Sequence, residues 1–151
     1  MAHFSKMYSK ILAALLAFLG FTCTECAKKE YGTPSATFKA KGVVVSKIND
    51  SPIEGIRAVL KAPLGYDKFF GIDTVYTDNK GIFNLKSGKW EIAFDKLYVE
   101  LKDVDGAKNG LFTDKEVEAD YSNEKFKGGN KRWYRGEAEK DLGIIKLETK
   151  E

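Results

Sequence analysis

The sequence predicts an all-β fold: an antiparallel β-sandwich of about seven or eight strands, preceded by a signal-peptide helix and a flexible tether. Short runs of alternating apolar and polar residues recur after residue 36, which is the period of half-buried strands. Clusters of Gly, Asn, Asp and Pro separate the runs. No window of a dozen residues shows the i, i+3, i+4 apolar spacing of an amphipathic helix. We therefore expect a signal peptide over residues 1–22, a tether over 23–36 and the sandwich over 37–151.

The N-terminal segment has the organisation of a signal peptide. Residues 1–10 are polar and basic, with Lys6 and Lys10 and no acidic residue, and nine apolar residues follow at 11–19. At about 1.5 Å per residue, this block is too short to span a hydrocarbon core of about 30 Å. The alternative is a buried core helix, which we disfavour because the block is apolar on all faces and lies at the extreme N-terminus. We expect the segment to direct export.

Cys23 is the residue that we expect to carry a lipid. It follows Gly20-Phe21-Thr22, which resembles the lipobox of bacterial lipoproteins, where small residues precede the acylated cysteine; Phe21 is larger than that pattern prefers. Each buried acyl methylene contributes about 0.8 kcal/mol, so more than one chain makes anchoring stable. The spacing of Cys23 and Cys26 also fits a redox or metal half-site, which no second cysteine pair supports. We expect the chain to reside in the cell envelope, with a membrane as its partner.

The polar segment from residue 24 to 36 shows no periodicity and is expected to be a mobile tether. Nine strand-like runs follow it, at 38–45, 56–61, 72–77, 82–85, 90–94, 97–101, 116–121, 133–136 and 144–147. The turn residues 49–52 close the first run. Residues 78–81 end in a glycine and separate the third run from the fourth, so these two runs are predicted to form a hairpin with the aromatic Phe83 pointing inward.

The residue counts exclude several kinds of chemistry. The only histidine is His3, and the only cysteines are Cys23 and Cys26, so the expected domain has neither imidazole nor thiol. Ser-His-Asp and Cys-His catalysis, zinc sites and thiol redox sites are therefore not expected in it, and we predict no cofactor. From Cys23 onward the chain carries 23 basic and 22 acidic residues, alternating in sign, so nucleic acid is not an expected partner.

Two groups of residues are candidate binding sites. Asp103, Asp105, Asn109 and Asp114 lie in and beside a glycine-containing loop, where carboxylates could surround calcium. The alternative, which we favour, is a hairpin end whose Asp and Asn side chains bond their own backbone. Tyr66, Phe69 and Phe70 lie between predicted strands and could grip a sugar or a protein. More often such aromatics fold back over the open end of a sandwich.

Two further patterns have simple structural explanations. Trp133 and Tyr134 stand among basic residues and could form a stacking platform, but a strand that alternates between core and rim is favoured because no broader basic surface is evident. Glu116, Glu118 and Asp120 fall at period 2, as expected for a solvated strand face. A carboxylate-based hydrolase would instead need two acids facing each other across a cleft.

Two family resemblances follow from longer stretches. Residues 41–44, 52–59 and 73–83 resemble the carboxypeptidase regulatory-like (transthyretin-like) sandwich, in which glycines such as Gly42 and Gly55 permit close strand packing. Residues 30–38, 103–112 and 133–139 resemble the lipoproteins of the radical SAM/lipoprotein system of Bacteroidetes. This resemblance implies an envelope lipoprotein, at the periplasmic face or the outer-membrane surface, accompanied by a radical SAM enzyme. We expect a non-enzymatic module that binds a protein or glycan; the alternative is a protein substrate of that enzyme.

Overall fold

The computed structural model describes residues 10–12, 14–15, 34–64, 68–89, 94–130 and 133–150. The chain divides into two units, residues 1–31 and 32–151. Residues 10–12 and 14–15 of the first unit are helical. Within the described residues, no helix has the length and apolar character needed to cross a membrane.

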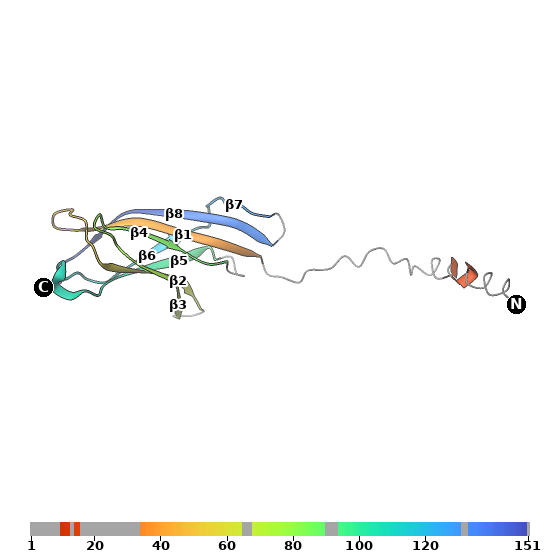
Figure 1. The fold of residues 1–151 in the computed structure, drawn as a ribbon, viewed down its shortest axis with the longest axis horizontal. Helices are drawn as coiled ribbons and strands as arrows, with labels where there is room; N and C mark the ends of the chain where they lie inside the picture. The colour runs from red at the N-terminus through yellow and green to blue at the C-terminus, as the bar shows by residue number, and fades with distance from the viewer. Residues whose placement is uncertain are drawn as a thin grey trace. The chain divides into compact units, whose positions relative to one another are not determined.

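The second unit is a β-sandwich of two four-stranded sheets, as predicted (Figure 1). One sheet has the order β4-β1-β8-β7 and is formed by β4 (Ile82–Lys86), β1 (Ser35–Ser46), β8 (Tyr134–Leu147) and β7 (Lys127–Gly128). The other has the order β3-β2-β5-β6 and is formed by β3 (Phe69–Tyr76), β2 (Ile56–Pro63), β5 (Lys96–Asp103) and β6 (Lys115–Asp120). A 3-10 turn, η1 (Gly106–Lys108), follows β5.

The core lies between the sheets and follows from strand alternation. Every second residue of β2 and β5 is buried. The buried side chains of β1, β4 and β8 belong to the same core and come from the opposite sheet. Phe38 packs edge-on against Tyr121, with ring centroids 5.0 Å apart, and Phe126 lies 5.9 Å from it on another side. Burying each large apolar side chain contributes about 1.5–3 kcal/mol.

The pairing of β1 with β8 differs from the antiparallel arrangement that the sequence suggests. These two strands are parallel, with Phe38 opposite Ala138 and Val44 opposite Ile145. Parallel neighbours need a long connection, and here the whole second sheet lies between β1 and β8 in the chain. The predicted runs 133–136 and 144–147 belong to the single 14-residue strand β8 and the residue before it.

The predicted hairpin between the third and fourth runs is wrong. β3 pairs with β2, whereas β4 pairs with β1 in the other sheet. The turn itself forms, because Asp78 Oδ1 accepts the N–H groups of Lys80 and Ile82 and Gly81 adopts a φ of 72°. The Gly81 carbonyl accepts a hydrogen bond from the N–H of Val44 in β1. The chain therefore continues from this turn into the opposite sheet. Phe83 points into the core, as expected.

Other sequence expectations have mixed outcomes. Gly42 permits close packing, since a Cβ there would lie 2.9 Å from the Phe83 ring. The short β7 was not predicted, because Lys127–Gly128 has no alternation. In the predicted run 90–94, residues 90–93 lie outside the described residues and Phe94 is not in a strand. β1 begins at Ser35 and Ala36 is buried, so the folded part includes the last residues of the predicted tether.

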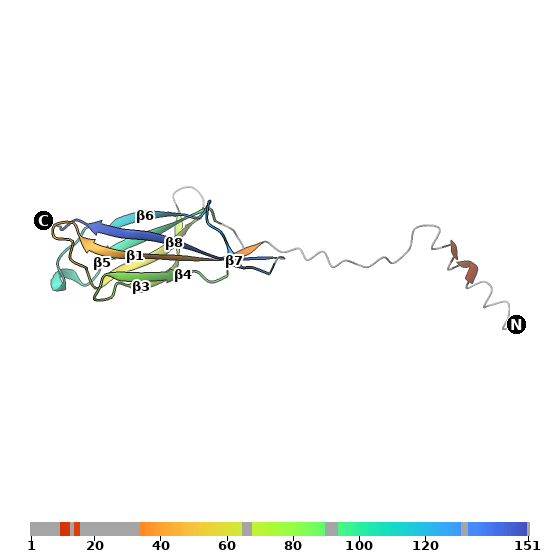
Figure 2. The ribbon, with the colours of Figure 1, turned by 90° about the horizontal axis from the view of Figure 1, so that it is seen from above.

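Strand register defines two ends of the sandwich (Figure 2). β1 and β8 both begin at what we call the proximal end, where Lys39 lies opposite Lys86 of β4. The segments 87–89, 94–95 and 121–130 belong to this end, since Tyr121 donates a hydrogen bond to the Lys39 carbonyl at 2.8 Å and its N–H to the Asp95 carbonyl. The segments 47–55, 77–81 and 104–114 belong to the distal end, beside Ser46 and Leu147.

Candidate functional site

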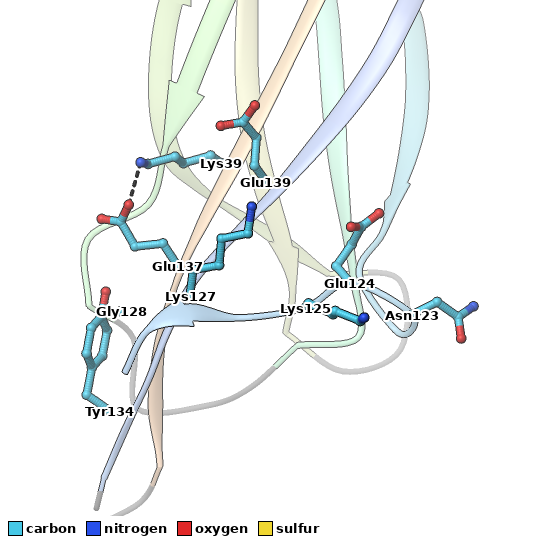
Figure 3. A pocket seen from close by; sticks show the side chains of 9 residues that line it. All are labelled: Lys39, Asn123, Glu124, Lys125, Lys127, Gly128, Tyr134, Glu137 and Glu139. Atoms are coloured by element: carbon cyan, nitrogen blue, oxygen red, sulfur yellow. Dashed lines mark hydrogen bonds and ion pairs between the residues drawn. The ribbon is translucent and has the colours of Figure 1, made fainter. Parts of the chain in front are cut away.

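An open groove of about 900 Å³ lies at the proximal end, on the outer side of the sheet that holds β1, β7 and β8 (Figure 3). A hollow at the distal end, beside Lys47 and Glu148, is much smaller, at about 310 Å³. The groove is formed by one side chain of β1, three of β8 and the segment that leads into β7. These residues are Lys39, Tyr134, Glu137, Glu139, Asn123, Glu124, Lys125, Lys127 and Gly128. We therefore take this groove as the candidate binding site.

Strand geometry places these side chains on one side of the sheet. Phe38 and Ala138 point into the core, so Lys39, Glu137 and Glu139 point outward. A β-bulge between Ser35 and Thr37 in the β1–β8 ladder accommodates Gly136, whose φ is 110°. The extra residue in β8 shifts the alternation of side chains along that strand, so that Tyr134 and Glu137 both line the groove. Gly128 of β7 pairs with Gly136 and brings the segment 123–128 alongside.

Lysines hold the carboxylates of the groove in ion pairs. Lys39 pairs with Glu137, which also lies 3.3 Å from Lys86, and Glu139 lies 2.6 Å from Lys41. The hydrogen bond from Lys39 lowers the pKa of Glu137, and the hydrogen bond from Lys41 lowers that of Glu139. Both carboxyl groups therefore stay ionised at neutral pH and act as fixed acceptors.

The groove also contains side chains that can accept a ligand. Among the described residues, Lys125 and Lys127 form no ion pair with a carboxylate, and both are exposed. Figure 3 shows both of them around the groove, with Tyr134 at its edge. The Tyr134 hydroxyl bonds Thr37 Oγ1 at 3.0 Å, and Lys89 Nζ lies 5.0 Å from its ring centroid. The arrangement therefore offers a fixed aromatic ring and two ammonium groups, which no described carboxylate pairs, to an anionic ligand.

The proposed calcium ligands are engaged with neighbouring parts of the chain. Asp103 Oδ2 accepts the Phe112 N–H at 2.9 Å, while its Oδ1 is buried with no hydrogen-bond partner among the described residues. Asn109 Nδ2 donates to Asp105 Oδ2 at 2.7 Å, and Asp114 lies 3.5 Å from Lys150. Within the described ranges, no three His, Cys, Asp or Glu side chains are grouped to hold a metal ion.

The predicted aromatic cluster is divided between two faces of a strand. Phe69 and Phe70 belong to β3. The sequence-based expectation that they lie between strands is wrong. Phe69 is 41% exposed and lies 5.1 Å from both the Tyr98 ring and Lys61 Nζ, whereas Phe70 packs against the core. Tyr66 and the lipidation candidate Cys23 lie outside the described residues.

The acidic residues of β6 contact polar or charged neighbours. Glu116 lies 2.9 Å from Lys61, and Glu118 lies 2.7 Å from Lys96. Asp120 accepts hydrogen bonds from Ser122, which lower its pKa. These contacts match the solvated strand face that their spacing predicted.

The groove itself was not predicted. Its residues come from three stretches that are far apart in the sequence, and only the parallel pairing of β1 and β8 brings Lys39 beside Glu137 and Glu139. The one available signal was Tyr134 among basic residues near the start of a strand.

No protein-family model matches the sequence, and no curated protein does so either. Among solved structures, the chain is similar to a 9R-lipoxygenase from Cyanothece PCC8801, with a TM-score of 0.43 and 14% identity over 72% of this chain and 16% of that one. It is also similar to the pilus 2b backbone protein of group B streptococcus, with a TM-score of 0.43 and 11% identity over 74% of this chain and 40% of that one. The chain thus spans well under half the length of the lipoxygenase and the pilus protein.

Proposed function

We propose that this chain is an envelope lipoprotein whose sandwich is a non-catalytic binding or interaction module. Its leader directs export, acyl chains on Cys23 hold it at a membrane, and it works beside a radical SAM enzyme. The observation that supports a binding role is the groove, with its tyrosine and two lysines that form no ion pair among the described residues. The proposed location in the cell envelope rests on the leader, on the position of Cys23 and on the resemblance to the lipoproteins of the radical SAM/lipoprotein system.

Two properties of the domain favour binding over catalysis. The sequence after Cys26 contains no histidine or cysteine, so it has neither an imidazole base nor a thiol nucleophile. A carboxylate-based hydrolase needs an acid whose pKa is raised, so that it is protonated near neutral pH. Lysines lower the pKa of Glu137 and Glu139 in the groove and of Glu100 on the other sheet. These groups suit charge pairing better than proton donation.

The experiment that tests the anchor compares the wild-type chain with a Cys23→Ser variant. Both are expressed with the full leader in a Gram-negative host, and membranes are separated from soluble periplasm. We expect wild-type protein in the membrane fraction and the variant in the soluble fraction, because one cysteine carries all the acyl chains. A matched Cys26→Ser variant should remain with the membranes. Continued membrane partition of the Cys23→Ser protein would contradict acylation at this residue.

The intact mass of the membrane-isolated chain separates the two roles proposed for the radical SAM enzyme. If the enzyme is only a partner, the mass equals that of the chain from Cys23 plus its acyl groups. A further mass difference that depends on co-expression of the enzyme would instead make this chain its substrate.

A further inference from the structure

Four exposed cations at the proximal end form what we call the basic rim: Lys89, Lys125, Lys127 and Arg135. Lys89 lies over the Tyr134 ring, and the Arg135 guanidinium lies 4.4 Å from the centroid of the Phe126 ring. Lys125 and Lys127 line the groove. Within the described part of the chain, none of the four forms an ion pair with a carboxylate.

The acids near the basic rim are mostly occupied. Glu124 lies 3.0 Å from Lys140. Asp120 accepts only the neutral hydroxyl and N–H of Ser122, so no cation pairs with it within the described residues. Glu137 and Glu139 share three lysines of β1 and β4. Asp95 is the one nearby exposed carboxylate without a side-chain partner among the described residues. Among the described residues, the four cations of the basic rim thus stand against two unpaired carboxylates, Asp95 and Asp120, which leaves an excess of positive charge at the proximal end.

The distal end has a different balance. Two exposed lysines there, Lys80 and Lys108, also form no ion pair within the described residues. However, Asp78 and Asp105 accept only neutral N–H donors, and Asp103 likewise bonds a backbone N–H. No cation pairs with these three carboxylates within the described residues, so they offset the two lysines. Among those residues, the positive excess thus lies at the end where β1 begins.

That end is also the one joined to the expected lipid. Ser35 follows Cys23 by twelve residues, and twelve extended residues span at most about 40 Å. If Cys23 is acylated, the proximal end stays within that distance of the bilayer. An anionic headgroup layer attracts each nearby lysine or arginine by a useful amount only within about a Debye length, roughly 10 Å at 0.1 M salt.

We propose that the basic rim docks on anionic phospholipid headgroups and holds the sandwich with its proximal end at the membrane surface. The inference builds on the lipid anchor of the proposed function, but it concerns a separate contact made by the folded domain. Lysine side chains suit this role because they act as mobile point charges that need no fixed headgroup geometry.

The test uses the mature chain without its lipid, residues 24–151. All buried core residues lie between Ala36 and Leu147, so this chain retains the complete core, and its thermal melt verifies folding. We measure co-sedimentation with vesicles of phosphatidylcholine alone and with vesicles that contain equal parts of phosphatidylglycerol. The expected result is binding to the anionic vesicles only, lost on raising the salt concentration.

A charge-removal pair identifies the surface. Lys125→Ala together with Lys127→Ala should weaken partitioning to anionic vesicles by about 25-fold, since each lysine near such a surface contributes roughly a factor of five. The matched control, Lys80→Ala with Lys108→Ala, removes two equally exposed, unpaired lysines from the distal end and should leave partitioning within about twofold.

Three results would overturn the docking proposal: no binding to the anionic vesicles, equal binding to neutral vesicles, or an equal loss in the control pair. A separate measurement tests the lipid anchor. The mass of the membrane-isolated chain shows whether Cys23 is acylated, whatever the result of the vesicle experiment. Inorganic phosphate that competes at concentrations too low to screen charge would point instead to a soluble anion as ligand of the groove, and would also count against the docking proposal.

Discussion

At the scale of single residues, Tyr121 connects the core to the floor of the groove. Its ring is buried at 2% exposure and packs edge-on against Phe38. Its hydroxyl donates a hydrogen bond to the carbonyl of Lys39, a residue that lines the groove. Burial raises the pKa of Tyr121 above its ordinary value near 10. The phenol therefore remains neutral in the folded state at pH values where it ionises in the unfolded chain.

We expect Tyr121→Phe to lower the free energy of unfolding by about 0.5–1.5 kcal/mol at neutral pH, because the Lys39 carbonyl loses its donor. The difference in unfolding free energy between the wild type and Tyr121→Phe should shrink above pH 10. There the unfolded wild-type chain releases a proton that the folded chain retains, so wild-type stability falls by up to about 1.4 kcal/mol per pH unit from this group. The phenylalanine variant lacks that loss. Urea unfolding between pH 8 and about 11 measures both effects.

Tyr76→Phe is the matched control, since Tyr76 is 60% exposed. Its stability should follow that of the wild type at every pH. The lysines whose pKa values are raised by ion pairs, such as Lys39 and Lys61, also lose stabilising contacts at high pH, but equally in all three proteins. A constant difference between wild type and Tyr121→Phe up to pH 11 would contradict a buried, neutral phenol.

At the scale of strands, the free edges of the two sheets are protected in different ways. β6 carries charges at alternate positions, and β7 has only two residues. β3 is longer and has a single charged residue, Asp73. Asp73 Oδ1 accepts the Thr74 N–H at 2.9 Å, and Oδ2 accepts the Lys86 N–H of β4 at 2.8 Å. One carboxylate thus covers donors on the edge strands of both sheets.

Replacing Asp73 with alanine should therefore expose the β3 edge. We expect a loss of about 1–2 kcal/mol in unfolding free energy, since two hydrogen bonds to a partly exposed carboxylate disappear. We also expect concentration-dependent self-association through the uncovered strand. Chemical denaturation and sedimentation velocity measure the two effects. Asp114→Ala, which removes only a surface ion pair with Lys150, should stay monomeric and within about 0.5 kcal/mol of wild type.

Strand positions were predictable from the sequence, whereas strand partners were not. Alternation alone located β1, β2, β4, β5 and β6 to within a few residues, because burial on one face imposes a period of two. The same residues carry no signal for pairing, so the turn at 78–81 was predicted to join a hairpin although it links the two sheets. The groove depends on pairing and was therefore missed. Alternation could have separated Phe69 from Phe70, since adjacent strand residues face opposite ways.

At the scale of the whole molecule, the described core residues lie within the sandwich. Its core residues and both sheets lie between Ser35 and Leu147, and the parallel ladder of β1 and β8 joins the two ends of this region. Ala36 and Phe38, near the start of β1, are fully buried. The stability of the domain should therefore be insensitive to the chain before residue 34 and very sensitive to the first residues of β1.

Three chains test this boundary by thermal unfolding: residues 24–151, 34–151 and 39–151. The first two should melt within about 2 °C of each other, because no core residue is removed. The third lacks Ala36 and Phe38, and loss of a buried phenylalanine alone costs about 3–5 kcal/mol. For a domain of this size that corresponds to a fall of at least about 10 °C, or to complete unfolding. If the chain 34–151 melts far below the chain 24–151, residues 24–33 contribute to the stability of the fold. These residues would then not act as a mobile tether.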